Sequence, residues 1–411
     1  MLFRKRRQFF KKFLTVYLLT VFLLGSFAVG LYVGRRTASS GSDGKSYDLT
    51  SIFSKKPPNV SMDLFWEVWN LLEKDYFNRE KIDKEKMIYG AVKGMVSSLN
   101  DPYTAFMDPG EYKKFSLSME GSFEGIGAEI GINDDNKLSV ISPLPNTPAS
   151  KAGLKPKDVI LKIDNYNAEN LTLDEAVSLI RGEKGTKVAL TIIRKGIETP
   201  KEIEIERDVI EIENVSWEMK EKGIGYIRIA MFGDRIESDF ENAVQGVLKN
   251  KADKIILDLR GNPGGYLDSA INIASYFLDE GMTVSVRRTS GGFEEELKAT
   301  GNNLLSNKKV AVLIDEGSAS ASEIVAGALR DNKGIKLIGK KSFGKGSVQS
   351  LEILERSSAL KLTVAQWLTP KRVNIEDKGI KPDVEIDFTA EDFGQGKDPQ
   401  FDEALEYLSK M

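Results

Sequence analysis

The sequence contains no cysteine and no histidine among its 411 residues. Without cysteine, the chain has no disulfide, no thiol nucleophile and no thiolate metal ligand. Without histidine, a Ser-His-Asp triad and histidine-ligated zinc are excluded as well. Proton transfer near neutral pH must therefore use a carboxylate, a tyrosine or a lysine whose pKa is shifted from its ordinary value. We accordingly expect neither a metal nor a cofactor.

Acidic residues are missing from the N-terminal segment. The first 36 residues carry eight arginines and lysines and no acid, although the whole chain has a formal net charge of −3. The remainder of the chain therefore carries −11. Because so acidic a body repels phosphate backbones, we expect no nucleic-acid partner.

Residues 13–34 form a hydrophobic run of 22 residues without a charge. As a helix this run spans about 33 Å, which is enough to cross a hydrocarbon core of roughly 30 Å. The basic cluster before it favours an N-terminus held inside and a body translocated outside. The alternative is a cleaved signal peptide, whose apolar region is usually only about 7–15 residues long. We expect an uncleaved single-pass anchor in the cell membrane and an extracytoplasmic body.

The rest of the chain is long enough for several domains. Apolar residues at helical spacing from Met62 predict an amphipathic helix, and residues 84–99 predict a second one. The expected fold class is a multi-domain α/β protein with an N-terminal transmembrane helix. Its expected parts are a tail and anchor (1–36), a linker (37–59), a helical segment (60–120), a small β-barrel with helices (121–207), an α/β core (208–388) and a C-terminal helical segment (389–411).

Residues 121–207 read as a unit of short strands. Thr172 and Glu175 have the spacing of a capping box and predict the start of a helix. Strands are expected at residues 138–141, 158–163, 187–194 and 202–206. This order of elements, with the run SPLPNTPASKAGLKPKDVILKIDN at its centre, resembles the PDZ domain of bacterial exported proteases.

Beyond residue 208, strands alternate with helices. Strands are expected at residues 224–230, 254–259 and 309–314, and helices at residues 266–278 and 321–329. This alternation is typical of an α/β core, in which ligands meet the loops at the strand ends.

Three stretches at such junctions carry residues suited to chemistry. The first stretch, Asp258 to Gly265 (DLRGNPGG), is rich in glycine. Its backbone amides can therefore point into a cavity, as an oxyanion hole requires. A tight turn is the simpler interpretation. Glu316 to Glu323 (EGSASASE) places serines between a strand and a helix, where a serine is either exposed or simply caps the helix.

The third stretch contains a lysine between two glycines. Gly339, Gly344 and Lys345 fit the phosphate-binding pattern G-x-x-x-x-G-K, but Gly346 stands where Ser or Thr must bind magnesium. Without histidine, a lysine is the simplest base for a serine nucleophile. Such a lysine must be neutral, although its ordinary pKa is about 10.4, and burial near Phe343 would lower the pKa. We therefore expect Ser320 to be the nucleophile and Lys345 its base, with Gln349 orienting the lysine.

At these residues the chain resembles the carboxyl-terminal processing (tail-specific) serine peptidases. The resemblance rests on SASASE, on FGKGSVQ, on DLRGNPGG and on the closing GIKPD, and it covers nearly the whole chain. It implies Ser320 as nucleophile, Lys345 as base and Gln349 as the residue that orients the lysine. It also implies an oxyanion hole formed by the amides of Ala321 and of Gly264 or Gly265, with Glu323 near the site. Ser318 and Ser322 are the alternative candidates for the nucleophile.

The resemblance also implies how substrates are chosen. A PDZ domain adds a peptide to a sheet edge and holds its terminal carboxylate with backbone amides. The expected carboxylate loop is Gly125, Ile126, Gly127 and Ala128, and Val177 and Ile180 are expected to line the side-chain pocket. Their simpler interpretation is ordinary domain core. Substrates would be proteins with free C-terminal tails.

Regulation and assembly are expected on the same basis. The PDZ domain would gate activity, with Arg181 as a regulatory contact, although an isolated arginine is more simply a solvated charge. Related proteases use their helical ends to dimerise, so a homodimer and a regulatory protein partner are expected. The alternatives are a catalytically silent PDZ scaffold and an acyl-transfer or ligand-binding α/β protein.

Overall fold

The computed structural model describes residues 61–133, 137–144, 146–194, 199–211, 213–389, 392 and 395–411. The basic tail, the hydrophobic run at 13–34 and the linker lie outside these residues. Across the described ranges, no helix is both long enough and apolar enough to cross a bilayer. The chain divides into two compact units, residues 1–82 and 83–411, which are described separately.

In the first unit, helix α3 (Asp63–Asp75) begins where the apolar spacing predicts it. A short 3₁₀ turn, η1 (Arg79–Lys81), follows. Helix α3 has no buried residue, and Leu64 and Trp66 are exposed.

The second unit begins with two capped helices. In α4 (Lys84–Ser97), the Asp83 carboxylate accepts two N–H groups of the first turn. In α5 (Pro109–Met119), Asp108 and Glu111 form a capping box. Strand β1 (Ala105–Met107) lies between the two helices.

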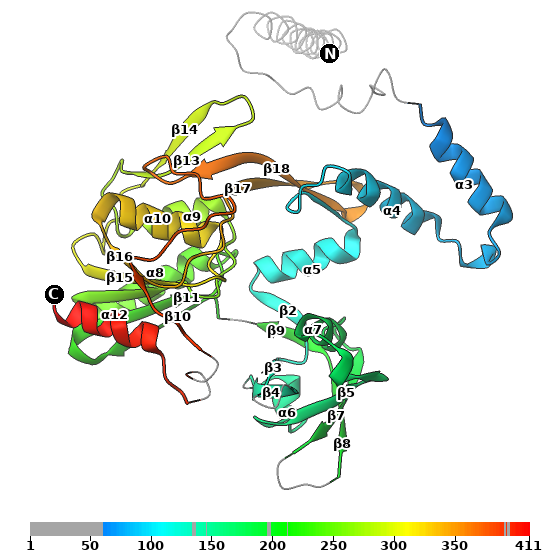
Figure 1. The fold of residues 1–411 in the computed structure, drawn as a ribbon, viewed down its shortest axis with the longest axis horizontal. Coiled ribbons are helices and arrows are strands. Elements are labelled where there is room, and N and C mark those ends of the chain that lie inside the picture. The colour runs from blue at the N-terminus through cyan, green and yellow to red at the C-terminus, as the bar shows by residue number, and fades with distance from the viewer. Residues whose placement is uncertain are drawn as a thin grey trace, which may run out of the picture. The chain divides into compact units, whose positions relative to one another are not determined.

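The PDZ part is a sheet with two helices (Figure 1). Its strand order is β3-β4-β5-β7-β8, with β6 paired to β5. The strands are β3 (Ala128–Ile132), β4 (Leu138–Pro143), β5 (Val159–Ile163), β6 (Tyr166–Asn167), β7 (Lys187–Ile193) and β8 (Lys201–Glu206), and the helices are α6 (Pro148–Lys151) and α7 (Leu173–Ile180). Glu175 and Thr172 cap each other at the start of α7, so the predicted capping box is confirmed.

A ribbon of two strands connects the PDZ part to the remainder. Strand β2 (Ser122–Gly125) enters the PDZ part, β9 (Asp208–Glu211) leaves it, and the two pair antiparallel. Between β8 and β9, the buried Arg207 donates hydrogen bonds to the carbonyls of Leu179 and Ile180 at the end of α7. The end of α7 is therefore held to the same ribbon.

The core is a six-stranded sheet in the order β10-β11-β12-β15-β16-β19. All its neighbours pair in parallel except β10 with β11. The strands are β10 (Val215–Lys220), β11 (Ile224–Ile229), β12 (Lys254–Asp258), β15 (Lys309–Ile314), β16 (Lys336–Gly339) and β19 (Val384–Glu385). The three predicted core strands are confirmed as β11, β12 and β15.

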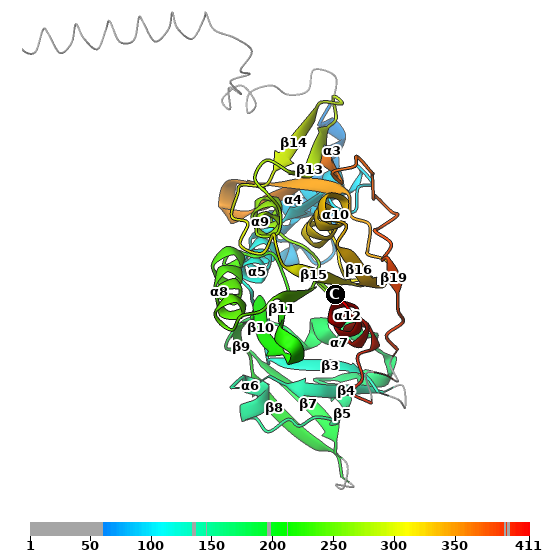
Figure 2. The same ribbon diagram turned by 90° about the vertical axis from the view of Figure 1, so that its left-hand side faces the viewer.

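Helices cover both faces of this sheet (Figure 1, Figure 2). Alternate residues of β12 point to opposite faces. Leu257 belongs to the large core beneath helices α8 (Ile236–Lys249), α9 (Leu267–Ser275) and α10 (Ala321–Lys333). Ile256 packs instead with Ala404 and Leu408 of α12 (Pro399–Ser409). The apolar face of α12 is thus buried inside this unit, which corrects the expectation that this face is free for dimerisation.

A second sheet, which the sequence did not predict, is antiparallel and centred on β18 (Ala359–Leu368). Its other strands are β1, β13 (Thr283–Thr289), β14 (Glu294–Lys298) and β17 (Ser347–Ile353). The sequence of β17, SVQSLEI, places two polar residues in succession at Gln349 and Ser350, so it lacks the period-2 pattern of a strand. This sheet matters for the site because β17 begins two residues after Lys345.

Candidate active site

The glycine-rich loop and the serine corner follow neighbouring parallel strands. Strand β12 leads into the loop and β15 into the corner, so both emerge at the same edge of the sheet. Asn262 fastens them together, because its carbonyl accepts the Ala319 N–H at 3.0 Å and the Ser322 hydroxyl at 2.9 Å. Two motifs separated by more than 50 residues therefore form one rigid structure.

Ser320 stands at the N-terminus of α10 in a strained conformation. Its φ of 53° and ψ of −113° lie outside the regions that L-residues favour. The side chain is partly exposed and lines a cavity of about 360 Å³. Ser318 and Ser322 are both fully buried, and their hydroxyls donate to the carbonyls of Leu259 and Asn262. Of the three candidate serines, Ser320 is the one presented to the cavity.

Lys345 lines the same cavity from the loop that precedes β17. Its side chain is half-buried, its carbonyl accepts the Trp367 indole N–H at 2.9 Å, and its Nζ lies 5.1 Å from the centre of the Tyr103 ring. Burial, together with the positive charge of Lys361, lowers the pKa of Lys345. Phe343 is 56% exposed, so the aromatic ring beside the amine is that of Tyr103 and not that of Phe343.

Acidic neighbours act on Lys345 in the opposite direction. The charges of Glu376, Glu323 and Asp101 favour the protonated lysine and partly offset its burial. In the part of the chain that the structure describes, no hydrogen bond joins the Ser320 hydroxyl to Lys345 Nζ. The two groups face one cavity without being in contact.

Glu323 connects the serine to the lysine loop. Its Oε2 accepts the backbone N–H of Ser320 at 2.8 Å and that of Lys345 at 3.0 Å. Its Oε1 accepts the Gly344 N–H at 2.7 Å and the Ser342 hydroxyl at 2.6 Å. Burial raises the pKa of this fully buried carboxyl, and the four hydrogen bonds oppose that effect. Glu323 therefore sets the position of the serine relative to the lysine.

The two glycines of the loop lie too close to neighbouring residues to carry a side chain. A Cβ on Gly264 would lie 2.8 Å from the Ser320 Cβ, and one on Gly265 would lie 2.1 Å from the Phe232 carbonyl oxygen. The Gly264 N–H already donates to Asn262 Oδ1 at 2.9 Å. By contrast, the N–H groups of Gly265 and Ala321 have no acceptor within the described ranges. The amides available to an oxyanion are thus those of Gly265 and Ala321.

Gln349 lies on β17 beside a bulge and lines the cavity. Its side-chain amide donates to Ser347 Oγ at 3.0 Å and to Thr363 Oγ1 at 3.4 Å. Among the described residues, no hydrogen bond joins it to Lys345. The structure brings Gln349 into the site without showing the predicted contact with the lysine amine.

The cavity walls include residues that the motifs did not indicate. Phe115 and Met119 reach it from α5, the helix that leads into the PDZ ribbon. Met231 and Leu267 add to an apolar lining, and Lys361 adds a cation. The i, i+4 spacing of Phe115 and Met119 marks one face of a helix, but nothing in that spacing indicates which cavity the face meets.

The predicted PDZ residues lie in the loop between β2 and β3 and at the end of α7. Gly127 has a positive φ of 72° and packs against Thr147, whose hydroxyl donates to the Gly127 carbonyl at 2.8 Å. Of the other residues in this loop, Gly125 is the last residue of β2, Ile126 is buried, and Ala128 is the first residue of β3. Strand β3 is at the edge of its sheet in the described strand order.

Helix α7 lies beside this edge strand. Its Ile180 is buried in the PDZ core, whereas Val177 is partly exposed. Arg181 is exposed, and its guanidinium lies 4.8 Å from the centre of the Phe123 ring on β2. Arg181 thus contacts the connecting ribbon at Phe123.

The described residues contain no group of three or more carboxylates placed to hold a metal ion.

Three family models match this chain. Peptidase family S41 matches residues 223–386, the PDZ domain matches residues 114–193, and the N-terminal domain of the activating protease CtpB matches residues 23–110.

Curated relatives match over most of the chain. The carboxy-terminal processing protease CtpA of Bacillus subtilis is 37% identical over 90% of this chain and 74% of that protein. CtpB of the same organism is 40% identical over 79% of this chain and 68% of that protein. A probable CtpA-like serine protease of Staphylococcus epidermidis is 41% identical over 78% of this chain, but the match spans only 64% of that protein.

Solved structures share the fold. A photosystem II D1 C-terminal processing protease is 27% identical, with a TM-score of 0.50 over 79% of this chain and 92% of that one. A putative S41 protease from Bacteroides fragilis, at 18% identity, has a TM-score of 0.57 over 87% of this chain and 98% of that one, and it supports the fold alone. The chain therefore belongs to peptidase family S41 and is a PDZ-containing serine peptidase of the carboxy-terminal processing type.

Proposed function

We propose that this chain is an endopeptidase that cleaves proteins near their C-termini with a Ser320–Lys345 dyad. The observation that carries the proposal is the cavity that both side chains line, because Ser320 alone of the three candidate serines is presented to it. The lowered pKa of Lys345 supports its role, since a base must be unprotonated to accept the serine proton.

In the first step, the Ser320 Oγ attacks the scissile carbonyl while its proton passes to Lys345 Nζ. The resulting oxyanion is held by the N–H groups of Gly265 and Ala321. The protonated lysine then donates this proton to the leaving amine, the C–N bond breaks, and an acyl-enzyme remains on Ser320. Water, deprotonated by the now neutral lysine, attacks the ester and releases the new C-terminus and the free serine.

Substrates are proteins whose flexible tails reach both sites of the second unit. The edge of β3 and the neighbouring helix α7 suit an extended peptide, and the loop Gly125–Ala128 is placed to receive its carboxylate. Val177 lines this groove, while Ile180 supports it from the core. Relatives named as carboxy-terminal processing proteases support this choice of substrate.

The PDZ part gates the cavity in this proposal. Helix α5, which carries Phe115 and Met119 into the cavity wall, runs directly into β2 of the connecting ribbon. Arg181 contacts Phe123 on the same strand, so a change at Arg181 can act on the cavity through β2 and α5. The separation of Ser320 from Lys345 corresponds to a resting state that a bound tail converts to the active one.

The cellular setting completes the proposal. The hydrophobic run at residues 13–34 anchors the chain in the cell membrane, with the peptidase outside the cytoplasm. Exposed apolar residues of α3, including Leu64 and Trp66, suit a homodimer contact. A regulatory protein partner would act on the PDZ gate.

A fluorophosphonate probe tests the proposed nucleophile directly. We expect mass spectrometry to find one phosphonylated residue, Ser320, and we expect its labelling rate to rise when a peptide with an apolar C-terminus and a free carboxylate is added. The matched control is the same peptide with an amidated C-terminus, which lacks the group that the PDZ loop binds. Labelling at Ser318 or Ser322, or equal acceleration by the two peptides, would contradict the proposal.

The pH dependence of kcat/KM tests the base. Because Lys345 acts in its neutral form, kcat/KM should rise with pH through the pKa of Lys345, and the lowered pKa places this rise below that of an ordinary lysine. Replacing the neighbouring cation (Lys361→Met) should raise the pKa of Lys345 and move the rise to higher pH. At pH 7 the variant should be about three- to tenfold slower. An unshifted profile in Lys361→Met would show that this cation does not act on the base.

A further inference from the structure

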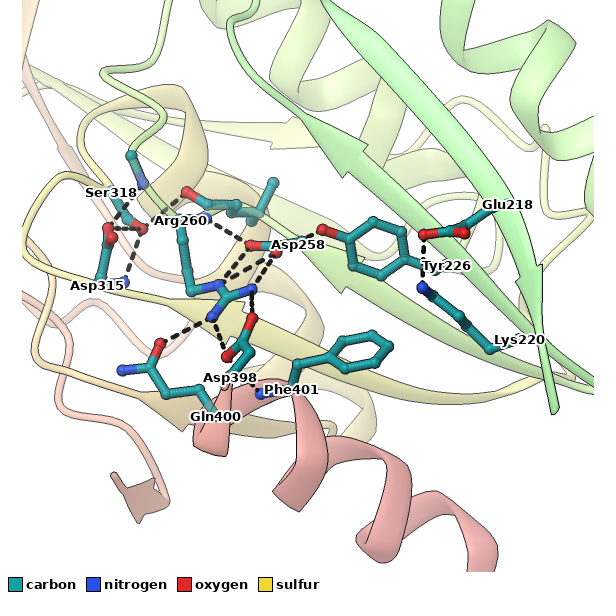
Figure 3. A network of polar contacts seen from close by, with 12 residues as sticks. Glu218, Lys220, Tyr226, Asp258, Arg260, Asp315, Ser318, Asp398, Gln400 and Phe401 are labelled. Carbon is teal, nitrogen blue, oxygen red and sulfur yellow. Dashed lines mark hydrogen bonds and ion pairs between the residues drawn. The ribbon is translucent and has the colours of Figure 1, made fainter. Parts of the chain in front are cut away.

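Arg260 lies in the glycine-rich loop, and the mechanism above gives it no role. Its side chain is only 13% exposed. Its guanidinium donates to both carboxylate oxygens of Asp258, at 2.7 to 3.1 Å, and to both of Asp398, at 2.8 Å each (Figure 3). The arginine thus joins the end of β12 to the start of the C-terminal helix.

The far end of this clamp is built into α12. The Asp398 carboxylate also accepts the Phe401 N–H at 3.0 Å, so it is the N-cap of the helix. Gln400 accepts a further hydrogen bond from Arg260 at 3.1 Å (Figure 3). Its own amide donates to the Ile386 carbonyl. Burial alone would raise the pKa of Asp398, but the bond with Arg260 leaves the pKa below its ordinary value.

The near end of the clamp reaches the serine corner through both residues that flank Arg260. The Gly261 N–H donates to Asp315 Oδ1 at 2.8 Å, and the Leu259 carbonyl accepts the Ser318 hydroxyl at 2.8 Å (Figure 3). Four residues after Arg260, Gly264 meets the Ser320 side chain. A shift of Arg260 would therefore change the position of the glycine-rich loop relative to Ser320.

We propose that Arg260 is a positioning residue, which ties the glycine-rich loop to α12 through Asp398 and thereby keeps the Gly265 and Ala321 amides aligned with Ser320. This inference rests on the proposed function, because it concerns the oxyanion of that reaction. The competing explanation is a buried ion pair that affects folding alone, and buried pairs are by themselves weak evidence for stability. A positioning role predicts that loss of the ion pair weakens binding of the transition state, whereas a purely structural role predicts only a loss of stability.

The test compares two matched substitutions in the full chain. Asp398→Asn removes one of the two carboxylate charges that face Arg260, leaves that of Asp258, and keeps a good N-cap. Asp158→Asn makes the same change in the PDZ part, where the fully buried Asp158 accepts two hydrogen bonds from Arg194, at 2.6 and 2.7 Å. For each variant, Tm, kcat and KM for a short peptide, and Ki for a peptide aldehyde are measured. The aldehyde forms a hemiacetal with Ser320, whose oxyanion occupies the same amides.

We expect both substitutions to lower Tm. Asp398→Asn alone should lower kcat by about tenfold or more, with KM changed less than about twofold and Ki for the aldehyde raised in proportion to the loss of kcat. Arg260→Lys keeps the charge but cannot make two parallel hydrogen bonds to Asp398. It should lower kcat and raise Ki in the same way, and it is measured if Asp398→Asn does not fold.

Ser320→Ala is measured alongside, because it removes hemiacetal formation altogether and so reports on the nucleophile and not on the loop. The clamp is refuted if kcat and Ki of the folded Asp398→Asn or Arg260→Lys enzyme stay within about twofold of wild type. It is also refuted if Asp158→Asn lowers kcat and raises Ki to the same extent.

Discussion

Ser320→Ala should lower peptide hydrolysis by about 10⁴-fold or more, since a peptidase of this kind cannot form its acyl-enzyme without the nucleophile. No other hydroxyl can replace it, because Ser318 and Ser322 are buried and already bonded to backbone carbonyls. The measurement is cleavage of an unfolded protein with an apolar C-terminus, followed by mass spectrometry of the products.

The matched controls for this result are Ser318→Ala and Ser322→Ala. Each removes a buried hydroxyl and one of the hydrogen bonds that its carbonyl accepts, so each should lower the free energy of unfolding by about 0.5–1.5 kcal/mol. Both should nevertheless cleave far faster than Ser320→Ala at temperatures where they stay folded. Activity of Ser320→Ala above about 1% of wild type would remove Ser320 from its proposed role.

Lys345→Met should be almost as damaging as the loss of the serine, because the chain has no histidine to take over the proton. Methionine fills similar space beside Tyr103 and Trp367 but has no basic group. We expect kcat to fall by at least about 10³-fold, and Ser320 labelling by a fluorophosphonate to slow in parallel.

Lys361→Met serves as the matched control for this prediction, because it removes a lysine from the same cavity. It should slow the enzyme only mildly and only through a shifted pH profile. If Lys345→Met retained most of its activity at every pH, another group would have to be the base. Tyr103 would then be the first to examine, although its burial and its acidic neighbours raise its pKa and make it a poor base near neutral pH.

Much of the candidate site could be predicted because its chemistry is local in the sequence. The absence of histidine and cysteine left a lysine as the simplest partner for a serine, and the glycine-flanked Lys345 stood out for that reason. The parallel strands that lead into the two other motifs also have strong apolar patterns, so β11, β12 and β15 were predictable.

Other parts of the site depend on contacts that no local pattern records. Phe343 was expected to bury the lysine because it is adjacent in sequence, yet Tyr103, more than 240 residues earlier, lies against the amine. Strand β17 escaped prediction because its sequence, SVQSLEI, places two polar residues in succession at Gln349 and Ser350 and so interrupts the alternation of a strand. The role of α12 was misjudged, because an apolar helix face looks the same whether it meets another chain or its own sheet.

The sequence by itself determined the reaction class of this protein, since composition and motif spacing narrow the choice of nucleophile and base to a few residues. Only the tertiary structure decided which serine is presented, which amides are free and how Glu323 and Arg260 hold the loops. The physical reason is that exposure, hydrogen-bond satisfaction and close approach belong to pairs of residues brought together by folding. Neither member of such a pair carries that information in its own stretch of chain.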